Sequence, residues 1–313
     1  MPELHIPVML EEVLSYLDCS RKGVYVDATL GDGGHALGIC RRLQAGSHFI
    51  GIDWDEQVFE DVRKRLQGFP AKVSLVHSSY TRLEEILAGL GVEKVTGLLL
   101  DLGVSTRQLS NDTRGFSYHG ESRLDMRMDC RLQRTAEDLV NELSEEELGE
   151  IIFRYGEERF SRRIARKIVG ARIKNGRIET NDQLVNIIKS AVPPAGRQEK
   201  HPARRTFQAL RIAVNRELGN VETVLPLAAR FLEPGGRLCV ISYHSLEDRL
   251  VKNYFREMSR DCRCPPGLPC VCKGVAELEL LTPRAIKAGN EEVRSNPRAR
   301  SARLRVAAKK DVL

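Results

Sequence analysis

The spacing of apolar positions changes along the chain and divides it into distinct parts. In the first part, short apolar runs rich in β-branched residues alternate with amphipathic stretches of helical period. The predicted strands lie at residues 24–26, 47–52, 73–77 and 97–101. The last of these is a continuous apolar run, which is typical of parallel strands buried on both faces. This alternation predicts a doubly wound α/β sheet.

The middle of the chain has a helical pattern without strand signals. Ser144-x-x-Glu147 and Thr180-x-x-Gln183 are capping boxes and mark two helix starts. Between residues 158 and 172, apolar side chains recur at helical spacing on one side, and basic side chains occupy the others. The basic positions are Arg159, Arg162, Arg163, Arg166 and Lys167. We therefore expect a helix with one packed face and one basic face.

Strand character returns in the last part of the chain. An apolar run follows the turn at Pro234 to Gly236 and predicts a fifth parallel strand. Residues 277–281 and 302–307 are expected to form a closing, hairpin-like pair, because apolar and polar positions alternate in the second segment. Arg303 and Arg305 would then share one exposed face.

These patterns predict a Rossmann-like domain made of residues 1–106 and 206–313, interrupted by an inserted helical domain at 107–205. The net charge of +6 is unevenly distributed: nine basic residues lie between positions 154 and 177, and five arginines between 294 and 305. Such patches suit a phosphate backbone, although each taken alone also fits a solvated helix face. Together the two patches favour RNA or DNA as a partner, and we expect the inserted domain to recognise this substrate.

Composition limits the class of protein. With 313 residues and 42% apolar content, the chain can bury a large α/β core. No apolar run approaches the length of a membrane span, and the first residues lack the basic and apolar regions of a signal peptide. We expect a cytoplasmic protein with no membrane partner.

A glycine-rich segment after the first predicted strand carries the strongest functional signal. Asp27 enters this segment, glycines follow, and Asp53 ends the next strand twenty residues after Gly33. This spacing predicts an adenosine-type pocket with an acid for the ribose hydroxyls. The pattern Gly31-x-Gly33-x-x-Ala36 also satisfies the relaxed dinucleotide fingerprint, so a nicotinamide cofactor and a plain glycine turn are alternatives. Asp32 inside the loop would repel a pyrophosphate, which favours S-adenosylmethionine.

The cysteines do not predict a disulfide framework. Four of them are clustered among prolines, at Cys262, Cys264, Cys270 and Cys272. Zinc is an alternative for this cluster, but zinc ribbons usually pair their ligands as C-x-x-C rather than C-x-C. We interpret the cluster as a structural loop and expect no metal in the reaction.

Several sequence blocks together resemble one known family. The blocks are Asp27-Ala-Thr-Leu-Gly-Asp-Gly-Gly-His35, Asp101-Leu-Gly-Val-Ser105, Arg114-Gly-Phe-Ser117, Leu124-Asp-Met-Arg-Met128 and Tyr243-His-Ser-Leu-Glu-Asp-Arg249. With them, the chain resembles the bacterial 16S rRNA cytosine-N4-methyltransferase family nearly from end to end. The resemblance implies a class I methyltransferase fold with a helical insertion and S-adenosylmethionine as donor. It implies a decoding-centre cytidine, cytidine 1402 of 16S rRNA, as acceptor. The oligomeric state stays open, with a homodimer as one alternative.

The resemblance also implies a set of donor contacts. They are Gly33, Gly34, His35, Asp53, Tyr80, Asp101 and Gln108. The backbone at Gly33 to His35 can border the methionine part, Asp53 can accept from the ribose hydroxyls, and Tyr80 offers an aromatic wall for adenine. An ionised Asp101 could hold the donor's ammonium group; its alternative role is a turn or helix cap. For the side chain of His35, the alternative is a cap of the following helix.

The catalytic residue is less clear than the donor contacts. Many enzymes that methylate an exocyclic amine have an acid or amide followed by Pro-Pro and an aromatic residue after the fourth strand, whereas this chain has Asp101-Leu-Gly-Val104. Asp125 is the candidate proton acceptor, with an ion pair to Arg123 or Arg127 as its alternative role. Further candidates near the base are Phe116, Tyr118 and His244.

Two other classes of protein compete with this interpretation. A cytosine-C5-methyltransferase would need a cysteine nucleophile, for which Cys270 is the candidate, but no base of known spacing accompanies it. A ribosome-assembly protein that binds RNA without catalysis would not need both Asp53 and Asp101.

Overall fold

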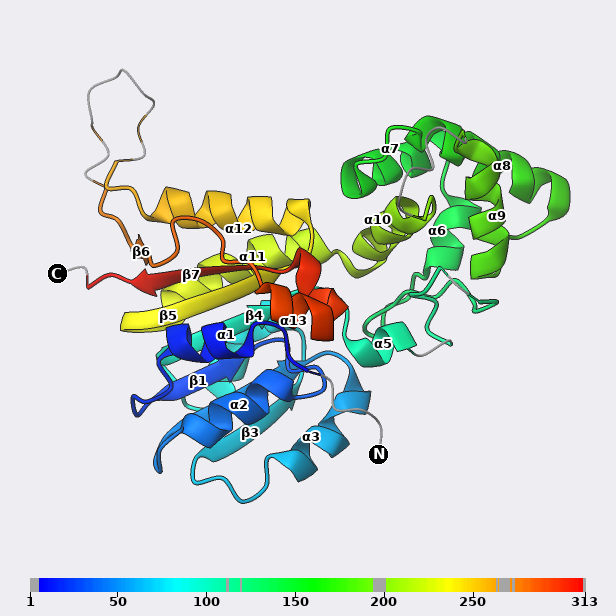
Figure 1. The fold of residues 1–313 in the computed structure, drawn as a ribbon. Coiled ribbons are helices and arrows are strands. Elements are labelled where there is room, and N and C mark those ends of the chain that lie inside the picture. The colour runs from blue at the N-terminus through cyan, green and yellow to red at the C-terminus, as the bar shows by residue number, and fades with distance from the viewer. Residues whose placement is uncertain are drawn as a thin grey trace. The chain divides into compact units, whose positions relative to one another are not determined.

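The computed structural model describes residues 6–110, 113–118, 120–193, 201–262, 264, 271 and 274–311. The chain divides into two compact units (Figure 1). The first consists of 1–103 and 218–313, and the second of 104–217. The second unit extends beyond the inserted segment expected from the sequence, because the helix that ends at Asn215 packs within it.

The first unit is built on a mixed sheet of seven strands in the order β3-β2-β1-β4-β5-β7-β6. The strands are β1 (Val24–Asp27), β2 (His48–Asp53), β3 (Lys72–His77), β4 (Val95–Asp101), β5 (Leu232–Ser242), β6 (Leu278–Leu280) and β7 (Arg303–Lys309). The neighbours among β1 to β5 are parallel, while β7 is antiparallel to both β5 and β6. The predicted doubly wound fold and its closing pair are confirmed.

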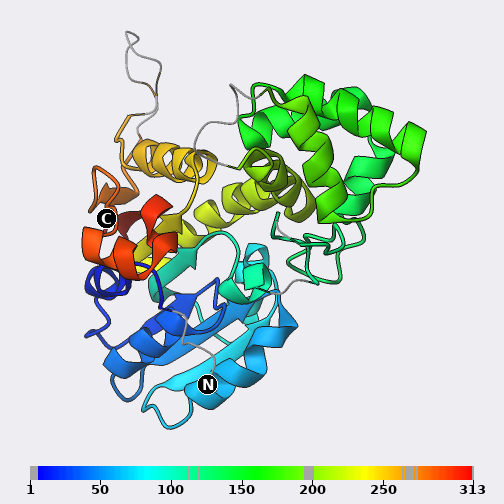
Figure 2. The same ribbon diagram turned by 45° about the vertical axis from the view of Figure 1, so that its right-hand side comes forward.

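Helices lie on both faces of this sheet (Figure 2). They are α1 (Leu10–Leu17), α2 (Gly34–Arg42), α3 (Phe59–Arg65), α4 (Leu83–Gly89), α11 (Glu217–Phe231), α12 (Ser245–Met258) and α13 (Asn290–Ser295). On β4, Leu99 belongs to one hydrophobic core, and Leu98 and Leu100 belong to the other. Each such leucine contributes roughly 1.5–3 kcal/mol by burial, so the continuous apolar run stabilises both layers at once.

One expectation for the closing pair is wrong. Leu304 and Val306 are buried as predicted, but Arg305 is only 8% exposed rather than on an exposed face with Arg303. Its Nε donates to Oδ1 of Asp248 on α12 at 2.7 Å, and Arg303 Nη1 donates to Oδ2 of the same residue at 2.8 Å. Strand β7 lies between β5 and β6, and α12 packs on it, so this face of the strand is covered.

The second unit is helical. Its helices are α5 (Thr106–Ser110), α6 (Ala136–Glu142), α7 (Glu145–Gly156), α8 (Ser161–Asn175), α9 (Asn181–Ala191) and α10 (Arg204–Asn215). Both predicted capping boxes are present, at the starts of α7 and α9. Helix α7 approaches α10 closely, since a Cβ on Gly156 would lie 2.7 Å from the carbonyl oxygen of Arg205.

Helix α8 has the two faces that the sequence predicts. Ile164 and Ile168 are buried, and the basic side chains from Arg162 to Lys167 are exposed. No helix among the described residues is long and apolar enough to cross a membrane.

Candidate functional site

The loop after β1 lies at the carboxyl edge of the sheet and is shaped by glycine. Gly33 precedes α2 with φ of +77°, a conformation that L side chains rarely adopt. A Cβ at Gly33 would also lie 2.9 Å from a methyl group of Val62. The loop is held from β2, because the Leu30 amide donates to the Ile52 carbonyl at 2.9 Å. A side chain at position 33 would therefore deform the loop.

Asp53 ends β2 beside this loop. Its Oδ2 accepts from the Gly31 amide and its Oδ1 from the Asp55 amide, both at 2.8 Å. Burial raises the pKa of Asp53 to about 6, against the opposing effect of these hydrogen bonds. The Trp54 amide also bonds to this carboxylate, and the remaining lone pairs can accept from ribose hydroxyls.

An aromatic pair follows β2 and β3. The rings of Trp54 and Tyr80 are 5.4 Å apart with an interplanar angle of 37°, and Tyr80 is buried at the start of a 3-10 turn, η2 (Tyr80–Arg82). The family resemblance predicts Tyr80 as a donor contact, but it does not include Trp54. The only sequence signal for Trp54 is its position directly after the ribose-type acid.

Asp101 ends β4 and is bonded to two other segments. Its amide donates to the Thr29 hydroxyl oxygen at 2.6 Å, and the Tyr243 hydroxyl donates to its Oδ1 at 2.7 Å. The other oxygen, Oδ2, lies 3.6 Å from Nδ1 of His35. Tyr243 begins one of the blocks that carry the family resemblance, but the sequence does not predict that it contacts Asp101.

The side chain of His35 does not cap α2. Gly33 is the N-cap residue, and the buried His35 ring instead contacts the Val8 carbonyl through Nε2 at 2.9 Å and faces Asp101 through Nδ1. The ring thus links the segment before α1 to the end of β4.

The electrostatics of this edge favour a cation. Burial raises the pKa of Asp27, which is 1% exposed, to about 6 and the pKa of Asp101 to about 7. Burial also lowers the pKa of His35. Two carboxyl groups therefore lie in a poorly solvated region beside an imidazole that resists protonation. A bound ammonium group would stabilise their ionised forms.

Gln108 lies in α5 of the second unit. It is 4% exposed, and it is paired with Ser105: the Ser105 amide donates to its Oε1 at 3.1 Å, and the Gln108 amide donates to Ser105 Oγ at 3.2 Å. Its contact with the donor stays a prediction.

Asp125 forms an ion pair with Arg127, one of the two alternative roles expected from the sequence. Arg127 donates through Nε to Oδ1 and through Nη2 to Oδ2, both at 2.8 Å. Although burial opposes it, these bonds hold the pKa of Asp125 below its usual value. A carboxylate with a lowered pKa is a weak proton acceptor. The ion pair therefore argues against catalysis by Asp125, which stays a prediction.

Of the other candidates near the base, Phe116 is buried, and Tyr118 and His244 have partners. Phe116 is 7% exposed, and the Tyr118 ring stacks on His201 with 4.7 Å between ring centroids. His244 is the N-cap residue of α12 and accepts from the Glu247 amide through Nδ1 at 3.4 Å. Nothing in these contacts identifies a proton acceptor.

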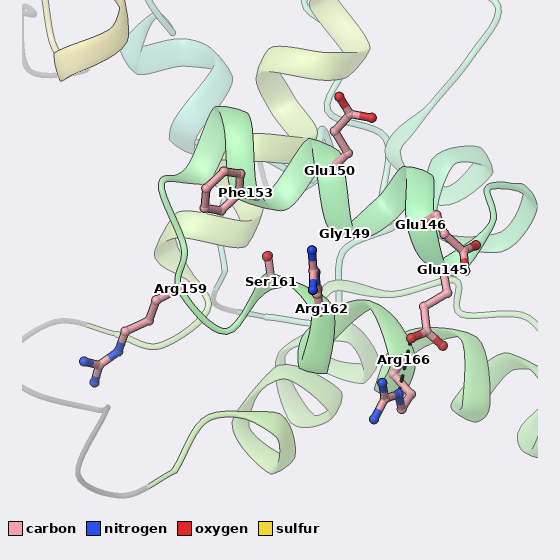
Figure 3. Close-up of a pocket in the computed structure, with 9 residues that line it drawn as sticks. All are labelled: Glu145, Glu146, Gly149, Glu150, Phe153, Arg159, Ser161, Arg162 and Arg166. Atoms are coloured by element: carbon pink, nitrogen blue, oxygen red, sulfur yellow. Dashed lines mark hydrogen bonds and ion pairs between the residues drawn. The ribbon is translucent and has the colours of Figure 1, made fainter.

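A groove of about 680 Å³ lies between α7 and α8 in the second unit (Figure 3). Its lining residues are Glu145, Glu146, Gly149, Glu150, Phe153, Arg159, Ser161, Arg162 and Arg166. The Phe153 side chain is exposed here, and Arg166 pairs with Glu145 at 3.2 Å (Figure 3). The acidic wall from α7 balances the basic wall from α8. No sequence pattern predicts this groove.

The cysteine cluster is described only in part. Cys262 is exposed and Cys264 is half-buried, whereas Cys270 and Cys272 lie outside the described residues. The zinc alternative and the nucleophile alternative therefore stay untested.

The sheet order, with β7 antiparallel beside β5, and the acids at the carboxyl edge define a class I methyltransferase. The model of the MraW methylase family matches residues 3–310. The chain belongs to this family, which confirms the resemblance found in the sequence.

Named relatives match over nearly the whole chain. The chain is 52% identical to the ribosomal RNA small subunit methyltransferase H of Geobacter sulfurreducens, over 97% of this chain and 98% of that protein. It is 50% identical to the protein of the same name from Halothermothrix orenii, over 97% of both. Among solved structures, an rRNA methylase from Streptococcus thermophilus matches with a TM-score of 0.41 and 10% identity, over 96% of this chain and 94% of that one.

Proposed function

We propose that this protein transfers a methyl group from S-adenosylmethionine to the N4 amine of cytidine 1402 in 16S rRNA. The observation that carries the proposal is the acidic edge of the sheet, where Asp27 is buried and Asp53 and Asp101 are half-buried, beside a loop that needs glycine at position 33. Two relatives are about half identical to this chain, and their names support small-subunit rRNA as the substrate.

The residues at this edge suit each part of the donor. Asp53 would accept from the ribose hydroxyls, the Trp54 and Tyr80 rings would border adenine, and the backbone from Gly33 to His35 would border the methionine part. The carboxylate of Asp101 would bind the ammonium group. When bound, the donor supplies a sulfonium-activated methyl group, so the protein's task is to position the acceptor.

The acceptor amine sets a second requirement. The N4 lone pair of cytosine is delocalised into the ring, so the nitrogen must be aligned with the methyl–sulfur bond and must lose a proton as the new bond forms. Asp125 is bound on both oxygens by Arg127, and the acceptor of this proton stays unassigned.

We assign RNA binding to the second unit, through the basic face of α8. Among the described residues, Arg162, Arg163 and Lys167 form no ion pair, while Arg166 is paired with Glu145. Exposed cations without acidic partners can bind phosphates without first breaking an ion pair. The groove beside them has mixed charge and is less suited to a phosphate backbone.

The decisive experiment uses small subunits that lack the modification, incubated with the protein and isotope-labelled S-adenosylmethionine. Nucleoside mass spectrometry should then find labelled N4-methylcytidine, mapped to position 1402. Labelled 5-methylcytidine would point to a cysteine mechanism instead. Absence of label, with RNA binding retained, would support the non-catalytic alternative. Thermal stabilisation by NAD rather than by S-adenosylmethionine would favour a dinucleotide enzyme.

A further inference from the structure

The hydrogen bonding of His35 fixes which ring nitrogen carries a proton. Its Nε2 lies 2.9 Å from the Val8 carbonyl oxygen. A carbonyl oxygen only accepts, so Nε2 must be the donor. In a neutral ring, Nδ1 then presents its lone pair to Asp101 Oδ2 at 3.6 Å. Two acceptors would face each other in a poorly solvated place.

A single proton between these two groups removes the conflict. The Tyr243 hydroxyl already donates to Oδ1 of Asp101, so Oδ2 is the oxygen left to face His35. A proton on Oδ2 or on Nδ1 turns two opposed lone pairs into a donor and an acceptor.

The surrounding charges are mostly negative. Glu247 on α12 raises the pKa of Asp101. Asp27 at the end of β1 and Glu292 on α13 raise the pKa of His35 against the larger effect of burial. Arg298, in a 3-10 turn (Pro297–Ser301), lowers the pKa of Asp101. Asp32 in the glycine loop in turn raises the pKa of Arg298. Burial is the largest cause and brings the pKa of Asp101 to about 7. The pair therefore changes its proton occupancy near neutral pH.

We propose that His35 and Asp101 hold one shared proton when no donor is bound. When the donor binds, its ammonium group takes the place of this proton, and the proton is released to water. His35 is thus a positioning residue that acts through Asp101, and Tyr243 fixes the other oxygen of the same carboxyl group. The inference rests on the proposed use of S-adenosylmethionine.

The sign of the pH effect follows from this exchange. Below the pKa of the pair, binding must release a proton, so affinity rises with pH; above it, no proton is released and affinity levels off. With a pKa of about 7, this exchange alone should increase the affinity about fivefold between pH 6 and pH 7 and release about half a proton at pH 7. Asp27 and Asp53, with pKa values of about 6, add to the release mainly at the low end of this range. Measurements should stay below about pH 7.5, because an α-amino group itself loses its proton near pH 7.7–8.0.

The experiment is calorimetric titration of the whole protein with S-adenosylhomocysteine, in two buffers of different ionisation enthalpy, between pH 6 and pH 7.5. The buffer dependence of the heat counts the protons released. Binding without proton release across this range would overturn the inference and leave the donor site intact. No binding at any of these pH values would instead overturn the proposed use of the donor, and the inference with it.

Two variants separate a shared proton from a merely structural role. Tyr243→Phe removes a hydrogen bond that lowers the pKa of Asp101, so the midpoint of the pH dependence should move to higher pH. His35→Phe removes the second site for the proton and should move the midpoint to lower pH. Opposite shifts in two folded variants support the exchange. If both variants weaken binding equally at every pH, the exchange is wrong; the proton count in the parent protein decides even where His35→Phe fails to fold.

Discussion

The carboxyl edge of the sheet and the basic face of α8 both concentrate charge, but they hold it in opposite ways. At the sheet edge, Asp27, Asp53 and Asp101 are hydrogen-bonded and poorly solvated, with raised pKa values. On α8, Arg162 and Lys167 extend into solvent. Charges held by hydrogen bonds in a shielded place can recognise one small cation, whereas exposed charges bind a polyanion in many registers. The difference matches the two ligands of the proposed reaction.

The largest effect on stability should come from breaking the buried ion pair between α12 and β7. Asp248→Ala leaves Arg305 buried without its partner, which should lower the free energy of unfolding by about 3–5 kcal/mol. The matched control is Glu150→Ala in the second unit, which removes an exposed pair with Arg154 and should cost about 0.3–0.5 kcal/mol. Urea denaturation measures both. Equal losses would show that burial does not make the Asp248–Arg305 pair more important for stability than an exposed pair.

A second change tests the donor side of the comparison. Asp53→Ala should weaken binding of S-adenosylhomocysteine by roughly 1.5–3 kcal/mol, because it removes a charged acceptor of the ribose hydroxyls. Calorimetry measures the loss, and RNA affinity should not change. Glu60→Ala on the exposed side of α3 is the control. If a folded Asp53→Ala protein keeps full affinity, Asp53 does not belong to the pocket.

A third change tests the RNA side. Replacing Arg162, Arg163, Arg166 and Lys167 by Gln should weaken binding of 16S rRNA and reduce the salt slope by about one for each phosphate that the helix no longer binds. Donor affinity should stay unchanged. The control replaces four exposed basic residues of the first unit, Arg41, Arg42, Arg63 and Lys64. An equal loss of RNA affinity in the control would mean that net charge, and not the α8 face, governs binding.

The smallest effect is expected from the cysteine cluster. Transfer to N4 needs no thiolate, so Cys270→Ala should retain methylation, and RNA that contains 5-fluorocytidine should not become covalently trapped. The assay is methyl incorporation together with a denaturing gel for the RNA adduct. Loss of activity in a folded variant, or a trapped adduct on Cys270, would exclude direct transfer to N4.

The sequence by itself determined the parts that depend on local pattern. Strands β1 to β5 follow from apolar runs, and the helix starts at Ser144 and Thr180 follow from their capping boxes. The acids at the strand ends were predicted because their residue type and their spacing from the predicted strands can be read directly from the sequence. Their position at one edge follows from parallel strand order.

Only the tertiary structure decided which distant side chains meet. Period-two alternation places Arg303 and Arg305 on one face, but it does not say that α12 covers that face and brings Asp248 to Arg305. In the same way, the Tyr243 hydroxyl reaches Asp101 from a residue far along the chain. Such contacts depend on the packing of whole elements, which a local pattern does not specify, and they set the burial that shifts each pKa. The sequence therefore determined which charged groups stand at the sheet edge, and the packing decided their protonation.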